Sequence, residues 1–425
     1  MNSVYPHISK NSNLHYFGGH SIILVENERY LLDDIETYLL EKIDGEKSID
    51  EIVEEVTSEL EIEDIDEVKR NIIEFVESKP EFIHIKSIPK ATKLKISGSK
   101  SLKVPNSIIV SLTNKCHQKC IHCFKSCDDK NNESIPTERL LKALEFLKGK
   151  LHSIQLTGGE PMLHKDFNRI LEFCKENFVT KITTTGTLIN LENVENFKGI
   201  SSIQIPIYAI NEKDHDAFTG TKGSHKKVMG AINAMIKHDI YPSVSSILTR
   251  ENVIEAEQLI NLCIKLKVPS IRFGILFPLG RAHKINKETL ISESEMIASI
   301  ASLKEKYKDK IYVDCDKEED YNIISENNEN IDSHTKLKCL PCWGGVFSFA
   351  IGSNGKVRPC EIMPENIFSM GNIINDDIED IINKANFDEL PTCISRWQND
   401  LNKNYNDLSS ICIQLKNYHM KYGCS

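Results

Sequence analysis

Residues 116–123 read Cys-His-Gln-Lys-Cys-Ile-His-Cys and come shortly after the apolar run at 108–112. The three cysteines of this stretch, Cys116, Cys120 and Cys123, are close enough in sequence to share one short loop. Three thiolates can ligate three irons of a 4Fe–4S cube, which normally takes four cysteines. The stretch therefore predicts an iron–sulfur site in which one iron stays open for another molecule.

A further cysteine, Cys127, allows a second interpretation. Together with Cys116, Cys120 and Cys123 it could form a four-cysteine structural zinc site. Structural zinc ligands usually come as separated pairs, whereas these cysteines form one packed run. We therefore favour iron, with Cys127 outside the ligand set.

The composition limits the function further. The chain has 425 residues, enough for two or three domains, and 40% of them are hydrophobic. Its formal net charge of −10 gives a nucleic-acid partner no electrostatic support. No apolar run approaches the roughly 20 residues of a membrane span, and the N-terminus lacks a signal-peptide pattern. We expect a cytoplasmic protein without a membrane span.

The 13 cysteines are unevenly distributed along the chain. Four lie at 116–127, six follow residue 338, and the remaining three are scattered. In a reducing compartment, clustered cysteines serve as metal ligands or reactive groups more often than as disulfides. The distribution therefore predicts two separate metal regions.

Strand-like and helix-like runs alternate between residues 105 and 310. The strand candidates are 107–112, 153–157, 181–185, 202–208, 243–248 and 270–276, with helical runs at about 135–148, 165–177, 224–238 and 252–267. This alternation predicts parallel strands joined by right-handed crossovers. Six such units fit an α/β fold of the partial (β/α)6 barrel type, where chemistry sits at the carboxyl ends of the strands.

The second strand ends in the sequence Thr-Gly-Gly-Glu-Pro at 157–161. Glycines let the backbone come close to a ligand, and Glu160 places an acceptor beside Gly158 and Gly159. Together with the cysteine loop, this segment resembles the GGEP motif of the radical S-adenosylmethionine (SAM) superfamily. The resemblance implies SAM on the open iron, with its amino group held by the Gly-Gly-Glu segment. It also implies cleavage of SAM to methionine and a 5′-deoxyadenosyl radical.

Two later segments extend this resemblance. Residues 183–187 resemble the family's TNG segment, with Thr185 where asparagine is usual, and they would contact SAM or cap the next helix. Residues 280–282 resemble a Gly-Arg-Ala step in which Arg281 binds the SAM carboxylate as a planar fork, the alternative being a surface arginine. The patterns assign no catalytic residue.

Residues 1–90 are expected to form an independent winged-helix-like α+β domain. A strand pair at 21–25 and 29–32 precedes three helical runs, the second of which opens with a capping box at 48–51. This arrangement resembles the PqqD-like domain of peptide-maturation enzymes, which implies that a leader peptide adds as a strand to the sheet edge. The alternative is a winged-helix domain without a peptide ligand. Residues 91–104 are predicted to be a basic, loop-like linker.

Residues 311–425 form the predicted cysteine-rich C-terminal domain. An Asn-Gly turn at 354–355 predicts a hairpin that brings Cys342 and Cys360 together. This segment resembles the start of a SPASM or Twitch extension, which implies an auxiliary iron–sulfur cluster. Its ligands would be Cys339, Cys342, Cys360 and one of Cys393, Cys412 and Cys424, of which we choose Cys412. A second auxiliary cluster and a zinc site at the same place remain open alternatives.

The combined resemblance implies a radical SAM enzyme that modifies a ribosomally synthesised precursor peptide bound through its leader. The expected product is a thioether crosslink, as in sactipeptide maturation, with a reductant such as flavodoxin or ferredoxin as partner. Carbon–carbon crosslinking and epimerisation are alternatives within the same chemistry. An alternative of another class is a non-catalytic zinc protein that presents a bound peptide.

Overall fold

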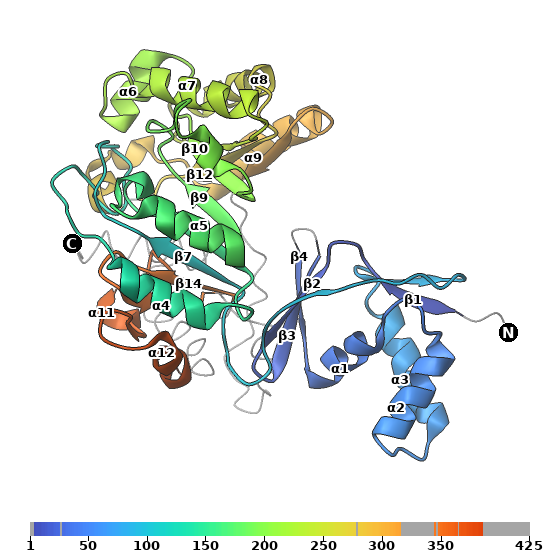
Figure 1. Ribbon diagram of the computed structural model, residues 1–425. Coiled ribbons are helices and arrows are strands. Elements are labelled where there is room, and N and C mark those ends of the chain that lie inside the picture. Colours follow the sequence, from blue (N-terminus) through green and yellow to red (C-terminus); the bar gives the residue numbers. More distant parts are fainter. Residues whose placement is uncertain are drawn as a thin grey trace. The chain divides into compact units, whose positions relative to one another are not determined.

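The computed structural model describes residues 4–25, 28–277, 279–315, 344–345, 347–363 and 365–385. The chain divides into two compact units (Figure 1). The first comprises the residues up to Asn106 together with Gly149–His152, and the second begins at Ser107. Among the described residues, no helix combines the length and the apolar character that a membrane crossing requires.

The first unit contains two small sheets and three helices. Its four-stranded sheet has the order β4 (Glu28–Leu32), β3 (His20–Val25), β2 (Asn13–Phe17) and β6 (Lys95–Ser99), and β1 (Tyr5–Ile8) pairs with β5 (Ile83–Lys86). The helices are α1 (Asp34–Lys42), α2 (Ile49–Glu59) and α3 (Ile65–Glu77). The predicted strand pair is confirmed as the antiparallel strands β3 and β4. Apolar residues from the strands and all three helices share one core.

Part of the segment expected to be a linker is instead a strand. β6 lies within 91–104 and runs parallel to β2. A Cβ at Gly98 would lie 2.1 Å from the carbonyl oxygen of Tyr16, so only glycine permits this pairing. His15, buried in β2, lies 3.0 Å from the Ser97 hydroxyl and 2.9 Å from the Val104 carbonyl oxygen. The expectation of a loop was wrong for Lys95–Ser99, because polar residues there satisfy a buried partner.

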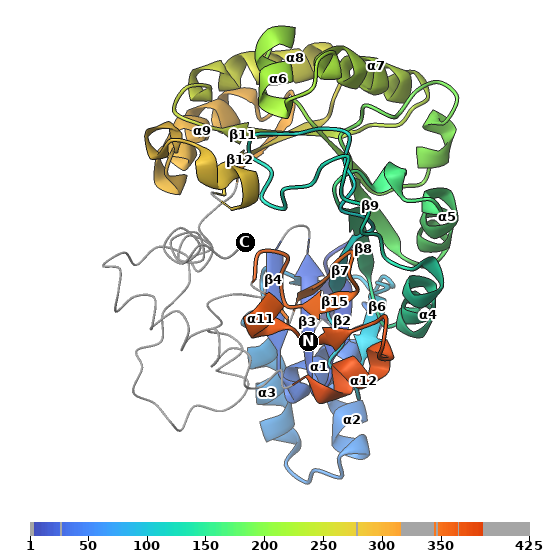
Figure 2. The ribbon, with the colours of Figure 1, turned by 90° about the vertical axis from the view of Figure 1, so that its left-hand side faces the viewer.

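The second unit is built on one long parallel sheet. Its parallel strands are β7 (Ser107–Ser111), β8 (Ser153–Thr157), β9 (Val179–Thr183), β10 (Ser202–Pro206), β11 (Ser243–Leu248), β12 (Ser270–Ile275) and β13 (Tyr312–Cys315). The connecting helices are α4 (Thr137–Leu147), α5 (Phe167–Asn177), α6 (Glu212–Thr219), α7 (Ser224–Lys237), α8 (Ala256–Lys265) and α9 (Glu293–Tyr307). Figure 2 shows α4, α5, α7 and α8 along the outer side of the sheet. The predicted strand–helix alternation is confirmed.

The sheet continues beyond the boundary expected at residue 310. β13 is a seventh parallel strand, paired with β12. The predicted C-terminal hairpin is present as β14 (Ser348–Ile351) and β15 (Lys356–Arg358), followed by α11 (Glu365–Phe368), β16 (Gly371–Asn372) and α12 (Ile378–Lys384). β14 pairs in parallel with β7, so the hairpin extends the barrel sheet at its other edge. β14 therefore lies in the same sheet as β7, the strand that precedes the cysteine loop at 116–123.

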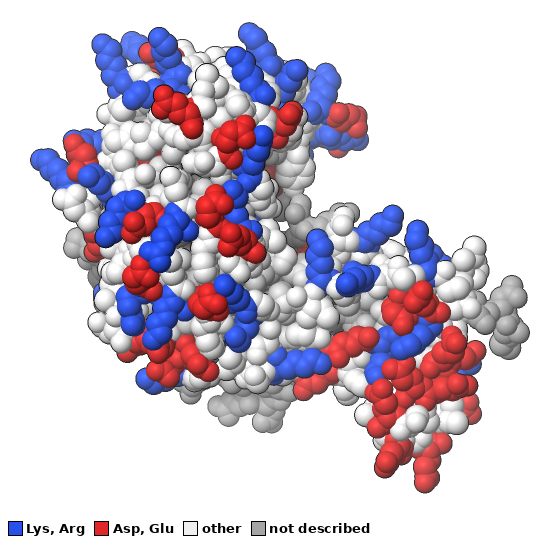
Figure 3. Space-filling model, viewed as in Figure 1, with Lys and Arg blue, Asp and Glu red and all other residues white. Residues whose placement is uncertain are grey.

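Acidic side chains gather over α2 and α3 (Figure 3). Residues 49–67 contain ten acidic residues and no basic one. Asp50 and Glu51 lie in the first turn of α2, and Asp66 and Glu67 lie in the first turn of α3, where negative charge complements the helix dipole. These acidic side chains therefore stabilise the N-terminal ends of α2 and α3.

We predict that Ser48→Ala loosens α2. The Ser48 hydroxyl accepts from the Glu51 backbone N–H at 3.3 Å, and the Ser48 backbone N–H donates to the Glu51 carboxylate at 2.8 Å. Loss of this cap should cost about 1 kcal/mol. Hydrogen exchange of the α2 amides in the full chain should accelerate accordingly. Ser58→Ala, at an exposed position of the same helix, is the matched control and should leave exchange unchanged.

Candidate active site

A cavity of about 410 Å³ lies where the strands of the parallel sheet end. Among the residues that line it are the predicted site residues Cys116, Cys120, Cys123, Gly158, Gly159, Thr185 and Arg281. The cavity extends past them to side chains of β10, β11 and β12, among them Gln204, Ser245 and Arg272. The predicted cluster loop, glycine motif and arginine therefore surround one space large enough for a small molecule.

The cysteine loop is held by its own backbone. The N–H of Cys116 donates to the Asp128 carbonyl oxygen at 2.8 Å. The N–H groups of Lys119 and Ile121 donate to carbonyl oxygens at the end of α6, each at 3.0 Å. These bonds tie the loop both to its own return segment and to a neighbouring helix. The fold thus holds the backbone of the cysteine loop in place.

The charge state of the three thiols differs. Burial raises the pKa of Cys116 and of Cys120 to about 12, whereas a hydrogen bond with Cys127 lowers the pKa of Cys123 to about 6. Metal binding requires thiolates, so loading the site must release protons from the first two cysteines. A positive cluster would be the natural compensation for three buried thiolates.

A zinc ion and an iron–sulfur cube place different demands on the three cysteines. Within the described ranges, no three side chains of the Cys, His, Asp and Glu types converge closely enough to hold one ion. In a cube each cysteine ligates a different iron, so the sulfurs need not meet at one point. Cys127 is buried, and its sulfur lies 3.8 Å from the Asn114 side-chain oxygen.

Gly158 and Gly159 pack against the cysteine loop. A Cβ at Gly159 would lie 2.5 Å from the Lys115 carbonyl oxygen, and one at Gly158 would lie 2.3 Å from the Thr113 carbonyl oxygen. The Gly159 N–H also donates to Thr113 at 2.7 Å. We expected these glycines to admit a ligand. They do line the cavity, but the close approach that requires glycine is to the protein's own backbone.

Glu160 is fully buried and joins two of the predicted motifs. Its carboxylate accepts hydrogen bonds from the Thr184 hydroxyl at 2.8 Å, the Thr185 backbone N–H at 2.8 Å and the Thr185 hydroxyl at 2.6 Å. These donors hold the segment at 183–187 against the Gly-Gly-Glu turn. The contact of Glu160 with the SAM amino group stays a prediction.

Arg281 clamps the cysteine loop from the opposite side. Its backbone N–H donates to the Cys123 carbonyl oxygen, and its Nε donates to the Cys120 carbonyl oxygen, both at 3.0 Å. Gly280 permits this approach, because a Cβ there would lie 2.4 Å from the Phe124 carbonyl oxygen. Arg281 is therefore part of the site and not a detached surface arginine. Its contact with the SAM carboxylate stays a prediction.

An aromatic cluster at the loop was not predicted. The His122 Nε2 lies 2.9 Å from the Tyr208 hydroxyl, and the ring of Phe218 stacks on Tyr208 at 4.5 Å between centroids. Burial lowers the pKa of His122 to about 3 and raises the pKa of Tyr208, so both groups are neutral. His215 accepts from the Tyr208 backbone N–H at 3.2 Å, which gives it a structural part. His122 lies between Cys120 and Cys123, and this position is the sequence feature from which a role at the site could have been predicted.

The predicted auxiliary site is only partly described. Cys360 follows β15, and burial raises the pKa of its thiol. Cys339, Cys342 and Cys412 lie outside the described residues, as do Cys393 and Cys424. The proposed ligand set can therefore be placed at Cys360 alone.

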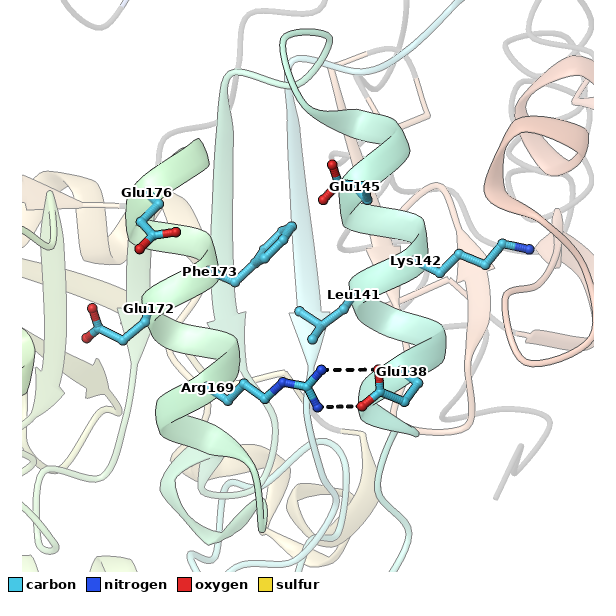
Figure 4. Close-up of a pocket in the computed structure, with 8 residues that line it drawn as sticks. All are labelled: Glu138, Leu141, Lys142, Glu145, Arg169, Glu172, Phe173 and Glu176. Atoms are coloured by element: carbon cyan, nitrogen blue, oxygen red, sulfur yellow. Dashed lines mark hydrogen bonds and ion pairs between the residues drawn. The ribbon is translucent and has the colours of Figure 1, made fainter.

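A second hollow lies on the outer surface between α4 and α5 (Figure 4). It has a volume of about 580 Å³ and charged side chains around Leu141 and Phe173. Arg169 crosses it to pair with the Glu138 carboxylate at 3.1 Å. Its lining comes from two outer helices and includes none of the predicted site residues, so the cavity at the cysteine loop is the stronger site.

Comparison with known proteins supports this assignment of the two cysteine regions. Residues 110–263 match the model of the radical SAM superfamily, and residues 342–413 match that of SPASM, an iron–sulfur cluster-binding domain. The chain thus carries a radical SAM domain followed by a SPASM domain. A radical SAM domain holds a 4Fe–4S cluster and SAM, and a SPASM domain holds auxiliary iron–sulfur clusters.

Two curated relatives show how far the sequence similarity extends. The chain is 26% identical over 345 residues to the antilisterial bacteriocin subtilosin biosynthesis protein AlbA of Bacillus subtilis, an alignment that covers 77% of this chain and 72% of AlbA. It is 28% identical over 268 residues to a GTP 3′,8-cyclase of Clostridium botulinum, covering 60% of this chain and 81% of the cyclase.

Solved structures share the fold. The chain is similar to SuiB of Streptococcus suis bound to SAM, with a TM-score of 0.60 and 16% identity over 88% of this chain and 87% of SuiB. It is also similar to anSMEcpe with bound SAM and a Kp18Cys peptide, with a TM-score of 0.51 and 16% identity over 66% of this chain and 82% of that one. The mixed α/β radical SAM fold expected from the sequence is confirmed.

We predict that Gly159→Ala disrupts the cluster site. The added Cβ would push against Lys115 and against Cys116, whose Cβ would be 2.9 Å away. Iron retained by the cysteine loop in the presence of a chelator should fall about tenfold, as for other changes next to metal ligands. Gly230→Ala is the matched control, because nothing lies within 4 Å of a Cβ at that position in α7. Equal iron retention in the two variants would contradict this account of the glycine.

Proposed function

We propose that this protein is a radical SAM enzyme that modifies a ribosomally synthesised precursor peptide. The observation that carries the proposal is the joint cavity of the three cysteines, the glycine motif and Arg281 in a chain that also has a SPASM domain. The name of AlbA, a bacteriocin biosynthesis protein, and a solved complex of SuiB with its precursor peptide SuiA support a peptide substrate.

The first unit offers a place for the leader of such a peptide. β4 is an edge strand of its four-stranded sheet and can accept a further strand by main-chain hydrogen bonds. A groove of about 430 Å³ runs along α3 and is lined by Arg70, Ile73, Glu74, Glu77 and Ser78. We propose that this unit is a PqqD-like leader-recognition domain. The strand edge would supply affinity, and a side-chain groove would supply specificity.

In the proposed mechanism, removal of a hydrogen atom from the peptide depends on the bound cofactors and not on a protein side chain. When bound, the cluster and SAM supply a 5′-deoxyadenosyl radical that removes a hydrogen atom from the peptide. Cys116, Cys120 and Cys123 would hold the cluster, and Arg281 and the glycine turn would keep their loop in place. Glu160 would orient Thr185, which lines the cavity and would face SAM. The apolar part of the cavity wall would exclude water from the reacting carbon.

We propose a thioether as the product. A C–H bond of one peptide residue and the S–H bond of a cysteine are lost, and a C–S bond forms. The hydrogen atom would leave with the deoxyadenosyl group and the thiol proton would go to solvent, and an auxiliary cluster held in part by Cys360 would supply an acceptor for the remaining electron. A flavodoxin or ferredoxin would supply the electron for SAM cleavage. Reducing conditions in the cytoplasm would keep the cysteines free of disulfides and so available to ligate the clusters.

Mass spectrometry of co-expressed precursor tests this product. A precursor peptide should lose two hydrogens for each link when it is expressed with the wild-type protein. The variant C116A/C120A/C123A should leave its mass unchanged. A mass-neutral product with the wild-type protein would favour epimerisation. A loss of two hydrogens that persists after every precursor cysteine is replaced would favour a carbon–carbon link.

A binding measurement tests the leader site. Ile73→Ser removes apolar surface from the groove along α3 and should weaken binding of a fluorescent leader peptide to the full chain about tenfold. Ile65→Ser lies on the same helix at a residue that is 56% exposed and outside the groove lining, and it should bind normally. Circular dichroism melting checks that both variants fold. Equal affinities in two folded variants would place the leader elsewhere.

A non-catalytic zinc protein that presents a peptide is the second candidate, because four cysteines lie close in sequence at 116–127. Metal analysis distinguishes the two. Anaerobically purified protein should contain iron and sulfide and be brown, whereas the adaptor would contain zinc and be colourless.

A further inference from the structure

A buried ion pair joins the loop of the SAM cluster to the loop that follows the hairpin. Lys125 lies two residues after Cys123, and Glu361 directly follows Cys360. The Lys125 Nζ donates to the Glu361 Oε1 at 2.6 Å, and each side chain is only 15% exposed. The contact therefore spans 236 residues of sequence and connects two cysteine regions.

Ser111 completes this contact from the end of β7. Its hydroxyl donates to the Glu361 Oε1 at 2.7 Å and accepts from the Lys125 Nζ at 2.6 Å. The three side chains thus form a closed ring of hydrogen bonds anchored on the rigid sheet. β14 pairs with β7 up to Val110, one residue before this anchor. Strand pairing and the polar ring together leave the two loops little freedom relative to one another.

The Cys360 loop is itself tightly turned. The Met363 backbone N–H donates to the Cys360 carbonyl oxygen at 3.2 Å, and the Arg358 guanidinium donates to the Met363 carbonyl oxygen at 3.1 Å. Glu361 lies inside this turn, so a displacement of its backbone would also displace the adjacent Cys360.

The polar contacts between α4 and the C-terminal segment lie away from the cysteines. Arg139 of α4 donates to the carbonyl oxygens of Ile373 and Asp376 at 2.7 and 2.9 Å. Lys142 pairs with Asp377 at 2.5 Å, with side chains 61% and 50% exposed. These contacts fasten the far end of the segment. The Lys125–Glu361 pair is distinguished by its burial and by its place between two cysteine loops.

We propose that Lys125 is a positioning residue for the auxiliary cluster. From the loop of the SAM cluster it holds Glu361, and through Glu361 it sets the position of Cys360. This inference rests on the proposed function, in which Cys360 ligates an auxiliary cluster. Removing the charge of Lys125 leaves the largely buried Glu361 carboxylate with only the Ser111 hydroxyl and the charge of Arg358 to stabilise it, so we expect the Cys360 loop to shift toward water.

Replacing the three cysteines of the SAM cluster allows the auxiliary cluster to be measured alone. In the background C116A/C120A/C123A, the remaining iron belongs to the auxiliary site. Lys125→Met in this background should change the electron paramagnetic resonance spectrum of the reduced auxiliary cluster and speed its loss to a chelator about tenfold. Lys125→Arg, which keeps the charge, should restore most of both properties. Lys142→Met, which removes the exposed cross-contact, is the matched control and should change neither.

The outcomes are distinguishable. A background protein without iron would overturn both the proposed auxiliary cluster and this inference. A background protein with iron whose spectrum and stability are the same in Lys125→Met and Lys142→Met would overturn the inference alone. If Lys125→Met does not fold, Lys125→Gln replaces it, because it removes the charge but keeps a hydrogen-bond donor beside Glu361, and it should show the same accelerated iron loss.

Discussion

The structure depends on the way in which the cysteine loop is held from several sides. α6 accepts hydrogen bonds from two of its backbone N–H groups, the Gly-Gly-Glu turn packs directly on its backbone, and Arg281 donates to two of its carbonyl oxygens. Each of these partners belongs to a different strand–helix unit of the parallel sheet. Cluster binding requires three neighbouring thiolates, which repel one another, so a loop that carries them needs such external support.

The same requirement explains why the motifs recognised in the sequence are coupled in space. Glu160 uses its buried carboxylate to hold the segment at 183–187, and the glycines before it make room for the cysteine loop. These residues therefore act on one another before any cofactor contact is considered. A substitution at one motif is expected to disturb the others, and loss of SAM binding in such a variant does not by itself identify a SAM ligand.

Local sequence patterns predicted much of this fold because their physical causes are local. The six strands of the barrel alternate with helices, and the Ser48–Glu51 box opens α2 as expected. The strand β6 was missed because its lysine, serine and glycine residues are typical of loops, and only its pairing with β2 shows why they are there. The pairing of β14 with β7 and the Lys125–Glu361 contact join residues more than 200 positions apart, which no local pattern reveals.

The central claim is that the loop at 116–123 holds a cluster with one open iron that binds SAM. Anaerobically purified protein should be incubated with SAM and a strong reductant, and 5′-deoxyadenosine and methionine should be quantified. The account predicts that the wild-type protein forms both products in equal amounts, whereas C116A/C120A/C123A forms neither even though its C-terminal cysteines are intact. Iron-loaded wild-type protein that leaves SAM uncleaved, or a triple variant that cleaves it, would contradict the claim.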